Sequence, residues 1–468
     1  MKTIFVTLPA GLSIRNILFT GVLERLTASG HVRVVVLTPI LDMGERYQGL
    51  NDNLVFEHLP AVPRYASSRI INRMLSLRFQ QINNDPDLTS NKAKRRALRT
   101  TNLRQYLLDT VLSQPLPKSK IIQRLLTALQ NRSVNIPHTF QSLFDRYKPS
   151  LVFATNPHVM SEYYFLKYAN LNGISAVGMI HSWDAITTEG CLVAPSDFYF
   201  VWNKVMKREL SSIHGVHEGQ IMVTGIPQFD LYAEPIPDAR RAEFLLQQGL
   251  DPAKQTVLFA TSPGGLTPEE PEIVGRLVSA LNRKCAGNVQ VLVRIHQQDD
   301  VQRYASIKCP NVTFQVPGIH RTSLEDNRLM NQADISLLRD TLAYSDVVVN
   351  TVSTITIDAV ALGKPVVNVA FDLHDRNYHR SVRRYFSLVH IRLIVKSGAS
   401  RLAGSFDELV SLTTRYLVNP ELEREERARF AEEMCYKVDG KSAERISAYL
   451  LDALDGELLT NETAAAGR

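Results

Sequence analysis

The fold of this chain is decided by one run, S-D-V-V-V-N-T-V-S-T-I-T-I-D-A-V-A-L-G-K-P-V-V-N-V-A-F-D, from Ser345 to Asp372. Its two apolar stretches, 347–349 and 366–371, predict two short buried strands. Between them we expect a helix over about 354–362, because Gly363 is typical of a helix end and the proline two residues later prevents continuation. Two strands joined by one helix form a βαβ crossover, so the sequence predicts parallel strands in an α/β domain.

Small hydroxyl residues, Ser353 and Thr354, stand where this helix is expected to begin. A helix N-terminus offers free N–H groups and a positive partial charge, which suit a phosphate. Asp358 follows one turn later, where a carboxylate can accept hydrogen bonds from a ribose. Ser and Thr are also ordinary N-cap residues, and a βαβ unit by itself indicates no ligand. The residues alone therefore leave both interpretations open.

The composition is ordinary for a globular protein, with 44% hydrophobic and 21% charged residues among 468. This length suggests about two to three domains. The four cysteines are widely spaced and form no metal-binding pattern, so we expect reduced thiols in a cytosolic protein. The first apolar run has about five residues, shorter than a signal peptide requires. No run of about 18 apolar residues is present, so we expect no transmembrane helix.

The net charge of +6 is concentrated in one segment. Residues 60–135 contain 14 Lys and Arg against three Asp and no Glu, whereas the remainder has 39 basic and 44 acidic residues. The segment contains amphipathic helical patterns, and basic amphipathic helices bind membrane surfaces because they attract anionic headgroups. Contact with a membrane or a lipid-linked substrate is one interpretation, and a solvated helical insertion is another. Nucleic-acid binding is a third, although no recognised nucleic-acid motif supports it.

Strand and helix patterns alternate on both sides of this basic segment. The opening strand–loop–helix–strand pattern over 4–37 is Rossmann-like but lacks G-x-G-x-x-G, so a dinucleotide cofactor is not indicated. A proline-rich stretch then separates two such halves. The predicted boundaries are 1–225 for the first domain with its insertion at about 60–135, 226–237 for the linker, 238–455 for the second domain and 456–468 for a disordered tail.

Polar groups follow the predicted strands of the second domain. In a parallel α/β sheet, ligands bind outside the carboxyl ends of the strands. The convergence of several polar groups at that edge predicts a ligand site more strongly than any one of them does. They are Ser262 with Gly264, Arg294 with His296, the loop at 317–318, and Ser353 with Thr354.

The run I-D-A-V-A-L-G-K-P-V-V at 357–367 resembles the nucleotide-binding segment of GT-B glycosyltransferases and of UDP-N-acetylglucosamine 2-epimerases. The resemblance implies two Rossmann-like domains whose parallel sheets face one another across a cleft. It also implies that Ser353 and Thr354 hold the donor diphosphate and that Asp358 holds the ribose. The usual ribose acid is Glu, and Asn350 stands where retaining families carry a second Glu, which argues against a retaining mechanism of that type.

Two further motifs extend this resemblance. The segment V-W-N-K-V-M-K-R-E-L with V-T-G-I-P-Q-F-D, at 201–210 and 223–230, resembles CDP-glycerol glycerophosphotransferase-like and capsular-polysaccharide proteins. The run V-R-I-H-Q-Q-D at 293–299 resembles their R-x-H-P motif, with Gln in place of Pro. The resemblance implies that Arg294 and His296 stabilise the leaving nucleotide, a role that needs no metal. His296 can also be an ordinary loop histidine.

The first domain should supply the acceptor side. Inverting transfer needs a base that takes the proton of the acceptor hydroxyl. The best candidate is Asp184, in H-S-W-D-A-I-T-T-E-G, which resembles a W-D-N motif of the same families; His181 and His158 are alternatives. Asp184 can equally cap the next turn. Arg15, in the first loop and helix, is a candidate for contacting an anionic acceptor or is simply solvated.

These resemblances imply a transferase that moves a sugar or polyol-phosphate group from a nucleotide-activated donor to a surface-polysaccharide or lipid-linked acceptor. We expect inversion, no metal, and no cofactor other than the donor itself as substrate. The alternatives are a UDP-sugar 2-epimerase and a non-catalytic protein that binds nucleotide sugars. We expect a cytoplasmic location, with peripheral contact at the inner face of the cell membrane where the membrane interpretation of 60–135 holds.

Overall fold

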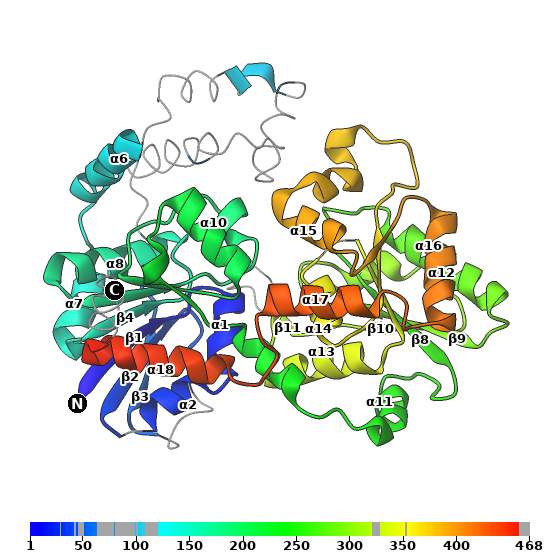
Figure 1. Cartoon of the computed structure of the whole chain (residues 1–468), viewed down its shortest axis with the longest axis horizontal. Helices are drawn as coiled ribbons and strands as arrows, with labels where there is room; N and C mark the ends of the chain where they lie inside the picture. The colour runs from blue at the N-terminus through cyan, green and yellow to red at the C-terminus, as the bar shows by residue number, and fades with distance from the viewer. Residues whose placement is uncertain are drawn as a thin grey trace. The chain divides into compact units, whose positions relative to one another are not determined.

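The computed structural model describes residues 1–28, 30–41, 44, 51–62, 79, 99, 102–104, 106–107, 120–320, 328–351 and 353–457 (Figure 1). They form two compact units. The first contains Met1–Pro227 together with the chain from Lys441 on, and the second contains Gln228–Gly440. Most of the expected insertion at 60–135 and nearly all of the expected tail at 456–468 lie outside the described residues.

The last helix belongs to the first unit, although we expected the second domain to continue to residue 455. This helix, α18 (Ser442–Asp455), packs along α2 (Val22–Thr27) (Figure 1). The Ser447 hydroxyl donates to the Val22 carbonyl at 3.3 Å, and Arg445 Nε donates to the Thr224 carbonyl at 2.8 Å. These partners are more than 200 residues away in the chain, so the local pattern that predicted the helix could not assign it to a unit.

The first unit is built on a seven-stranded sheet in the order β3-β2-β1-β4-β5-β6-β7, with every pair parallel. Its strands are β1 (Lys2–Thr7), β2 (Val32–Thr38), β3 (Leu54–His58), β4 (Leu151–Ala154), β5 (Ser175–Met179), β6 (Phe198–Val201) and β7 (Ile221–Val223). The central strands are apolar on both faces, as expected for a parallel sheet covered by helices.

Helices surround this sheet, and the aromatic rings of Phe5, Phe144 and Phe165 pack together in its core. The α-helices of the first unit besides α2 and α18 are α1 (Gly11–Leu18), α6 (Lys120–Ser133), α7 (His138–Tyr147), α8 (Met160–Asn172), α9 (Ala185–Thr188) and α10 (Lys204–His214); a 3₁₀ turn, η2, spans Glu218–Gln220. In the described part of the chain, no helix is long and apolar enough to span a bilayer.

The second unit repeats the arrangement with six parallel strands in the order β10-β9-β8-β13-β14-β15. These are β8 (Gln255–Ala260), β9 (Val289–Arg294), β10 (Val312–Gln315), β13 (Val347–Asn350), β14 (Val366–Val369) and β15 (Arg401–Ala403). A small antiparallel pair joins β11 (Ile319–His320) to β12 (Arg328–Leu329). Counted within each unit, the second sheet has the Rossmann order 3-2-1-4-5-6, and the first has the same order with a seventh strand added at its end.

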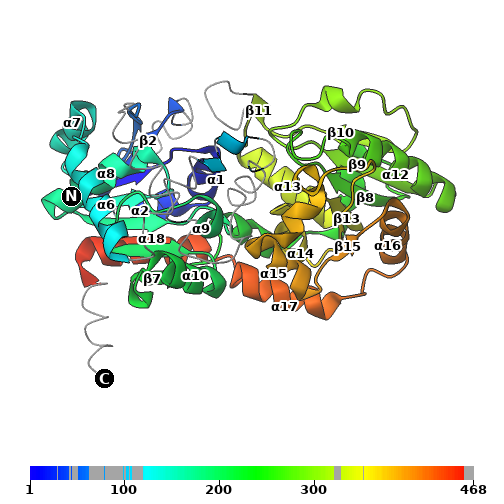
Figure 2. The ribbon, with the colours of Figure 1, turned by 90° about the horizontal axis from the view of Figure 1, so that it is seen from above.

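Alternate residues of the second sheet, such as Val257 and Phe259, pack against α12 and α16, which lie side by side (Figure 1, Figure 2). The α-helices of this unit are α11 (Arg241–Gln247), α12 (Glu270–Lys284), α13 (Gln332–Tyr344), α14 (Ile355–Ala361), α15 (Val389–Ser397), α16 (Phe406–Val418) and α17 (Arg424–Cys435). Its 3₁₀ turns are η3 (Pro227–Ala233), η4 (Asp238–Arg240), η5 (Val301–Tyr304), η6 (Tyr378–Arg380) and η7 (Val382–Ser387).

The predicted crossover unit is present as β13, α14 and β14, with the two strands paired in parallel. The helix has two turns and ends before Gly363, whose φ of 70° lies in the left-handed region that glycine adopts readily. The predicted α/β class, with two Rossmann-like halves and parallel sheets, is confirmed.

A buried carboxylate joins two strand ends in the first unit. Glu162, on α8, is completely buried. One oxygen, Oε2, accepts from the hydroxyl of Thr7 at the end of β1 at 2.5 Å, and Oε1 accepts from the N–H of Asn156, just after β4, at 3.1 Å. Burial raises the pKa of Glu162 to about 8. Sequence analysis did not single out this residue.

We predict that Glu162 makes the fold less stable as the pH rises. Since the pKa of Glu162 is about 8 when folded and 4.5 in its ordinary range, the folded state binds more protons between these values. The free energy of unfolding should therefore fall from about pH 4.5 to about pH 8, by up to about 1.4 kcal/mol per pH unit, and level off above. Glu162→Gln removes this contribution, so thermal unfolding of both proteins from pH 5 to pH 9 should show a shallower decline for the variant. Parallel curves for the two proteins would contradict the prediction.

Candidate functional site

The carboxyl ends of β8 and β13 meet at the point where the strand order of the second sheet reverses, which is where open α/β sheets bind ligands. Ser262, just after β8, is buried; its hydroxyl donates to Thr267 Oγ1 at 2.8 Å and its backbone N–H donates to Glu270 Oε2 at 2.9 Å. The predicted donor residue Ser262 is thus at the expected edge, but its side chain bonds within the loop.

Glu270, the first residue of α12, organises this edge and was missed by sequence analysis. It is completely buried. Its Oε1 accepts from the hydroxyl of Thr351 at 2.8 Å, and Oε2 accepts from Tyr304 at 3.3 Å besides Ser262. Burial, with the nearby charge of Asp299, raises the pKa of Glu270 to about 7. In the sequence, the one feature that could have indicated Glu270 is its place at the start of the helix that follows the glycine-rich end of a strand.

An ion pair lies beside Glu270. Asp299 Oδ1 is 2.5 Å from Arg303 Nη1, and Asp299 Oδ2 accepts from the Tyr304 hydroxyl at 2.8 Å. A Cβ atom at Gly264 would lie 2.6 Å from Asp299 Oδ1 and 2.7 Å from Arg303 Nη1. Gly264 therefore permits the loop after β8 to pack directly on this ion pair. This contact explains why the position requires glycine.

His296, in the loop after β9, is oriented by its neighbours. Its backbone N–H donates to Thr261 Oγ1 at 2.8 Å, and its Nδ1 accepts from the N–H of Gln298 at 3.0 Å. Because Nδ1 accepts, the neutral ring carries its proton on Nε2. This nitrogen is therefore a hydrogen-bond donor, the type of group that an oxyanion or phosphate oxygen requires.

The buried guanidinium of Arg294 is hydrogen-bonded to the neighbouring strand β10. Its Nη1 donates to Gln315 Oε1 at the end of β10, and Gln315 Nε2 in turn donates to Thr341 Oγ1 at 3.0 Å. This network ties β9 and β10 to α13. These contacts give Arg294 a structural role at the sheet edge, and its role toward a leaving nucleotide stays a prediction.

The predicted diphosphate turn is half-buried. Ser353 Oγ accepts from the N–H of Ile355 at 3.3 Å, and Thr354 already has helical backbone angles and makes no side-chain cap. Beneath them, Asn350 Oδ1 accepts from Thr356 at 3.2 Å and from Asn368 Nδ2 at 3.1 Å. This buried network fixes the start of α14 to β13 and β14.

Asp358, the predicted ribose residue, is buried, and its Oδ1 accepts from the hydroxyl of Tyr232 at 2.5 Å. Tyr232 lies on η3 and is itself buried. Asp358 also lies near the thiol of Cys435, whose pKa is raised by burial and by that carboxylate. The structure thus brings Asp358 to the same helix as the diphosphate turn, but hydrogen-bonds it to a tyrosine.

The strand ends of the first unit hold the predicted acceptor-side residues. His181, just after β5, is buried; its Nε2 lies 3.1 Å from Glu189 Oε1, and its carbonyl accepts from Asn16 Nδ2 at 3.2 Å. His181 Nδ1 is buried and has no hydrogen-bond partner among the described residues. The carboxylate oxygen accepts a hydrogen bond from Nε2–H, so Nδ1 carries the lone pair in the neutral ring.

Asp184 is the residue just before α9, and both of its carboxylate oxygens accept hydrogen bonds from nearby hydroxyl groups. Its Oδ1 accepts from the Ser182 hydroxyl at 2.5 Å, and its Oδ2 accepts from the Thr188 hydroxyl at 3.3 Å. Its backbone carbonyl accepts from the N–H groups of Thr187 and Thr188, each at 3.0 Å. The side chain thus bonds to hydroxyl groups of its own turn and makes no cap hydrogen bond to the backbone of α9, so both interpretations of Asp184 stay predictions.

Other titratable groups gather near α9 and α10. The rings of His158 and His214 lie 5.9 Å apart, and His214 Nε2 is 3.0 Å from the carbonyl of Ile186. Burial lowers the pKa of His158 and lowers that of His214 to about 4, so both are neutral near pH 7. Burial raises the pKa of Glu209 to about 7. Arg15 lies half-buried on α1.

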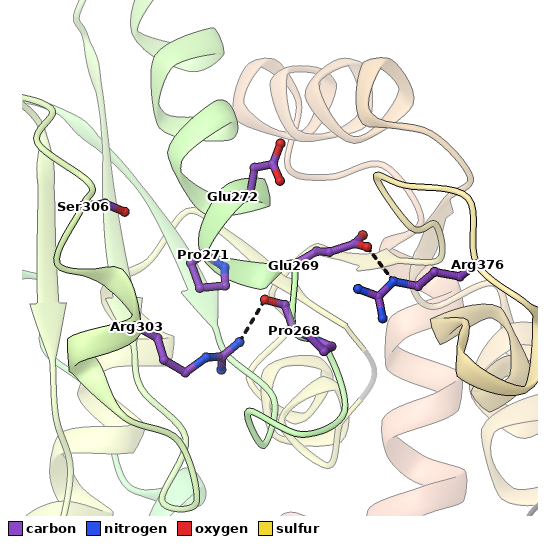
Figure 3. A pocket seen from close by; sticks show the side chains of 7 residues that line it. All are labelled: Pro268, Glu269, Pro271, Glu272, Arg303, Ser306 and Arg376. Atoms are coloured by element: carbon purple, nitrogen blue, oxygen red, sulfur yellow. Dashed lines mark hydrogen bonds and ion pairs between the residues drawn. The ribbon is translucent and has the colours of Figure 1, made fainter.

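A pocket of about 520 Å³ opens beside the start of α12 (Figure 3). Its two guanidinium groups are neutralised: Arg303 by Asp299, and Arg376 by Glu269, whose Oε1 lies 2.5 Å from Arg376 Nε. The predicted donor residues do not line this pocket. Within the described residues, no group of three or more His, Cys, Asp or Glu side chains is arranged to hold a metal ion.

Comparison with known proteins identifies one matching family model, CDP-Glycerol:Poly(glycerophosphate) glycerophosphotransferase, over residues 188–452, which is more than half of the chain. The match covers the whole second unit, the end of the first unit and most of α18. No curated protein matches the sequence.

Solved structures agree on the fold. The UDP-GlcNAc 2-epimerase of Neisseria meningitidis bound to UDP-GlcNAc is 14% identical and matches 97% of this chain and 100% of its own with a TM-score of 0.53. The S. aureus MnaA–UDP co-structure is 12% identical, with 97% of both chains covered and a TM-score of 0.52. A putative UDP-N-acetylglucosamine 2-epimerase from Listeria monocytogenes is 12% identical, with 96% of both chains covered and a TM-score of 0.52. At this identity the likeness shows the fold alone, and it confirms the predicted GT-B architecture.

Proposed function

Since this chain belongs to the CDP-glycerol:poly(glycerophosphate) glycerophosphotransferase family, we propose that it transfers a polyol-phosphate group from a CDP-activated donor to a surface-polysaccharide or lipid-linked acceptor. The family match carries this proposal, and it makes the chain a nucleotide-donor transferase. In the proposed reaction the acceptor oxygen bonds to the β-phosphorus of the donor, the bond from that phosphorus to the bridging oxygen breaks, and CMP leaves with the electron pair.

The donor diphosphate is proposed to lie at the strand ends of the second unit. His296 supports this proposal, because its Nε2–H is a donor, its backbone is held by Thr261 and its ring is held by Gln298. A donor fixed in advance stabilises the charge that develops on departing CMP without a metal. The backbone at Ser353 and Thr354 would bind the phosphates, while Gly264 allows the neighbouring loop to lie close.

Asp358 is proposed to bind the ribose, as the resemblance implies. Its carboxylate oxygen Oδ1 accepts from Tyr232 at 2.5 Å, so a ribose hydroxyl would bond to Oδ2, or to Oδ1 beside or in place of the tyrosine. Either arrangement makes Tyr232 a neighbour of the proposed ribose position.

On the acceptor side we favour His181 over Asp184 as the general base. His181 Nδ1 has a lone pair, and Glu189 beside Nε2 would stabilise the imidazolium that forms when a proton is taken. Both oxygens of Asp184 accept hydrogen bonds within its own turn. His181 Nδ1 is buried, so the side chains that cover it must move when an acceptor hydroxyl reaches it.

The function is tested by incubating the protein with CDP-glycerol and a poly(glycerophosphate) primer and measuring the nucleotide released. We expect CMP, dependent on the primer and unchanged by EDTA. Release of CDP would indicate transfer to the carbon of the activated group instead. Conversion of UDP-GlcNAc to free sugar and UDP without any primer, and no turnover of CDP-glycerol, would replace the proposal by an epimerase.

We predict that His181→Gln lowers the rate of transfer by about 10²–10⁴-fold with little effect on donor affinity, because general-base catalysis contributes that much. Asp184→Asn keeps an acceptor oxygen for the Ser182 hydroxyl and should lower the rate less than tenfold. Steady-state rates with titration of CDP-glycerol check both. A nearly inactive Asp184→Asn beside an active His181→Gln would make Asp184 the base.

We further propose that α6 contacts an anionic membrane. Ile121, Leu125 and Leu129 are 68%, 56% and 56% exposed, and their spacing of four places them on one face of the helix. Exposed apolar side chains in this pattern are typical of interfacial helices. The helix belongs to the basic segment 60–135, with 14 Lys and Arg, which would attract anionic headgroups.

We predict that replacing Ile121, Leu125 and Leu129 together by Ser reduces flotation with phosphatidylglycerol-containing liposomes at least severalfold. The matched control is the triple Ser variant of Leu171, Leu246 and Val418, which are 69%, 65% and 86% exposed on other elements. Wild type should not float with phosphatidylcholine alone. Equal flotation of the two variants would reject α6 as the contact.

A further inference from the structure

Glu270 stands at the reversal of strand order in the second sheet and joins three loops. Its carboxylate bonds to Ser262 after β8, to Thr351 after β13 and to Tyr304 of η5. Thr351 is two residues before Ser353, and two extended residues span at most about 7 Å, so the residue that bonds to the carboxylate is close in the chain to the proposed diphosphate turn. A completely buried acid is therefore adjacent to the place proposed for two anionic phosphates.

We propose that Glu270 is a positioning residue of the donor site that must carry a proton when the diphosphate binds, so that donor binding takes up a proton. This inference rests on the proposed donor site of the second unit. In the neutral form, the carboxyl group holds the three loops through its hydrogen bonds without repelling the phosphates.

The hydrogen-bond partners permit both protonation states. The N–H of Ser262 can only donate, but the hydroxyls of Ser262, Thr351 and Tyr304 can each donate or accept. When Glu270 is ionised, the N–H of Ser262 and the hydroxyl of Thr351 donate to it. The Ser262 and Tyr304 hydroxyls have one proton each, which Glu270 shares with Thr267 and Asp299. When it is protonated, one hydroxyl rotates to accept, and the network is kept. The change of charge therefore needs no rearrangement of the loops.

The charged neighbours do not neutralise Glu270. Arg303, on η5, is paired with Asp299 at 2.5 Å. On the same helix as Glu270, Glu272 pairs with Arg276 at 2.6 Å, and just before that helix Glu269 pairs with Arg376. From the loops after β8 and β13, the described contacts to Glu270 are hydroxyl and amide groups.

Opposing effects on the Glu270 carboxyl group keep its pKa near neutral pH, so it can take up a proton when the donor binds. Burial and the charge of Asp299 raise the pKa of Glu270 to about 7, whereas the hydrogen bonds from Ser262 and Thr351 lower it. A diphosphate nearby adds negative charge and must raise the pKa further. By linkage, affinity for the donor should be constant below about pH 7 and fall above it, by up to tenfold per pH unit.

The test is calorimetric titration of the full-length protein with CDP-glycerol from pH 6 to pH 9, at each pH in two buffers of different ionisation enthalpy. Both phosphates of CDP-glycerol are diesters, so they do not titrate in this range. We expect wild type to take up a fraction of a proton at pH 7.5. Glu270→Gln should bind the donor with no proton uptake and with an affinity that does not fall above pH 7.

Two further variants separate this role from a general effect on folding. Glu272→Gln, on the exposed side of the same helix, should keep the wild-type proton uptake. Thr351→Val removes a hydrogen bond that lowers the pKa of Glu270, so the fall in affinity should begin at a higher pH. This shift in the pH profile would not follow from a purely structural role.

Three results would overturn the inference. Binding without proton uptake by wild type rejects the role of Glu270 while leaving the donor site in place. Proton uptake that persists in Glu270→Gln assigns the proton to another group, such as His296. Absence of CDP-glycerol binding to wild type at every pH overturns the proposed donor site and this inference together.

Discussion

In each unit of this protein, a buried glutamate ties together two strand ends at the point where the strand order reverses. In the first unit Glu162 bridges β4 and β1, and in the second Glu270 bridges β8 and β13. In both, the acid lies on the helix after the strand and accepts from the N–H of the second residue beyond that strand. Each also accepts from a threonine hydroxyl at the carboxyl end of the neighbouring strand, Thr7 as the last residue of β1 and Thr351 just after β13. An unsatisfied buried carboxylate is costly, so these hydrogen bonds constrain the loops to one arrangement.

This constraint prepares the sheet edge for a ligand. The loops after β8 and β13 keep their backbone positions because Glu270 holds them, while Gly264 lets one of them rest on the ion pair of Asp299 and Arg303. The network of Asn350, Thr356 and Asn368 fixes the start of α14 from below. A site that is rigid before the donor arrives needs no reorganisation during the reaction, which is the basis of electrostatic catalysis.

The sequence predicted the elements well and the side-chain contacts poorly. The crossover at 345–372 was predictable because apolar strand runs, Gly363 and Pro365 are local signals. Local signals could not assign α18 to the first unit, because Arg445 and Ser447 bond to partners far away in the chain. The hydrogen bond between Tyr232 and Asp358 was likewise hidden, since it joins residues 126 positions apart.

Glu162 and Glu270 were missed for a related reason. An acid near a helix start reads as an ordinary solvated residue, and only the packing of neighbouring strands shows that it is buried. The fold places Ser353, Thr354 and His296 at one sheet edge, and their roles stay predictions.

The proposed donor site is tested most directly by hydrogen–deuterium exchange of the full-length protein with and without CDP-glycerol. If the donor binds there, CDP-glycerol should slow exchange in the second unit, in the loops after β8 and β9 and at the start of α14. Protection confined to the first unit, or no change anywhere at a saturating concentration of CDP-glycerol, would contradict the assignment of the donor site to the strand ends around Glu270.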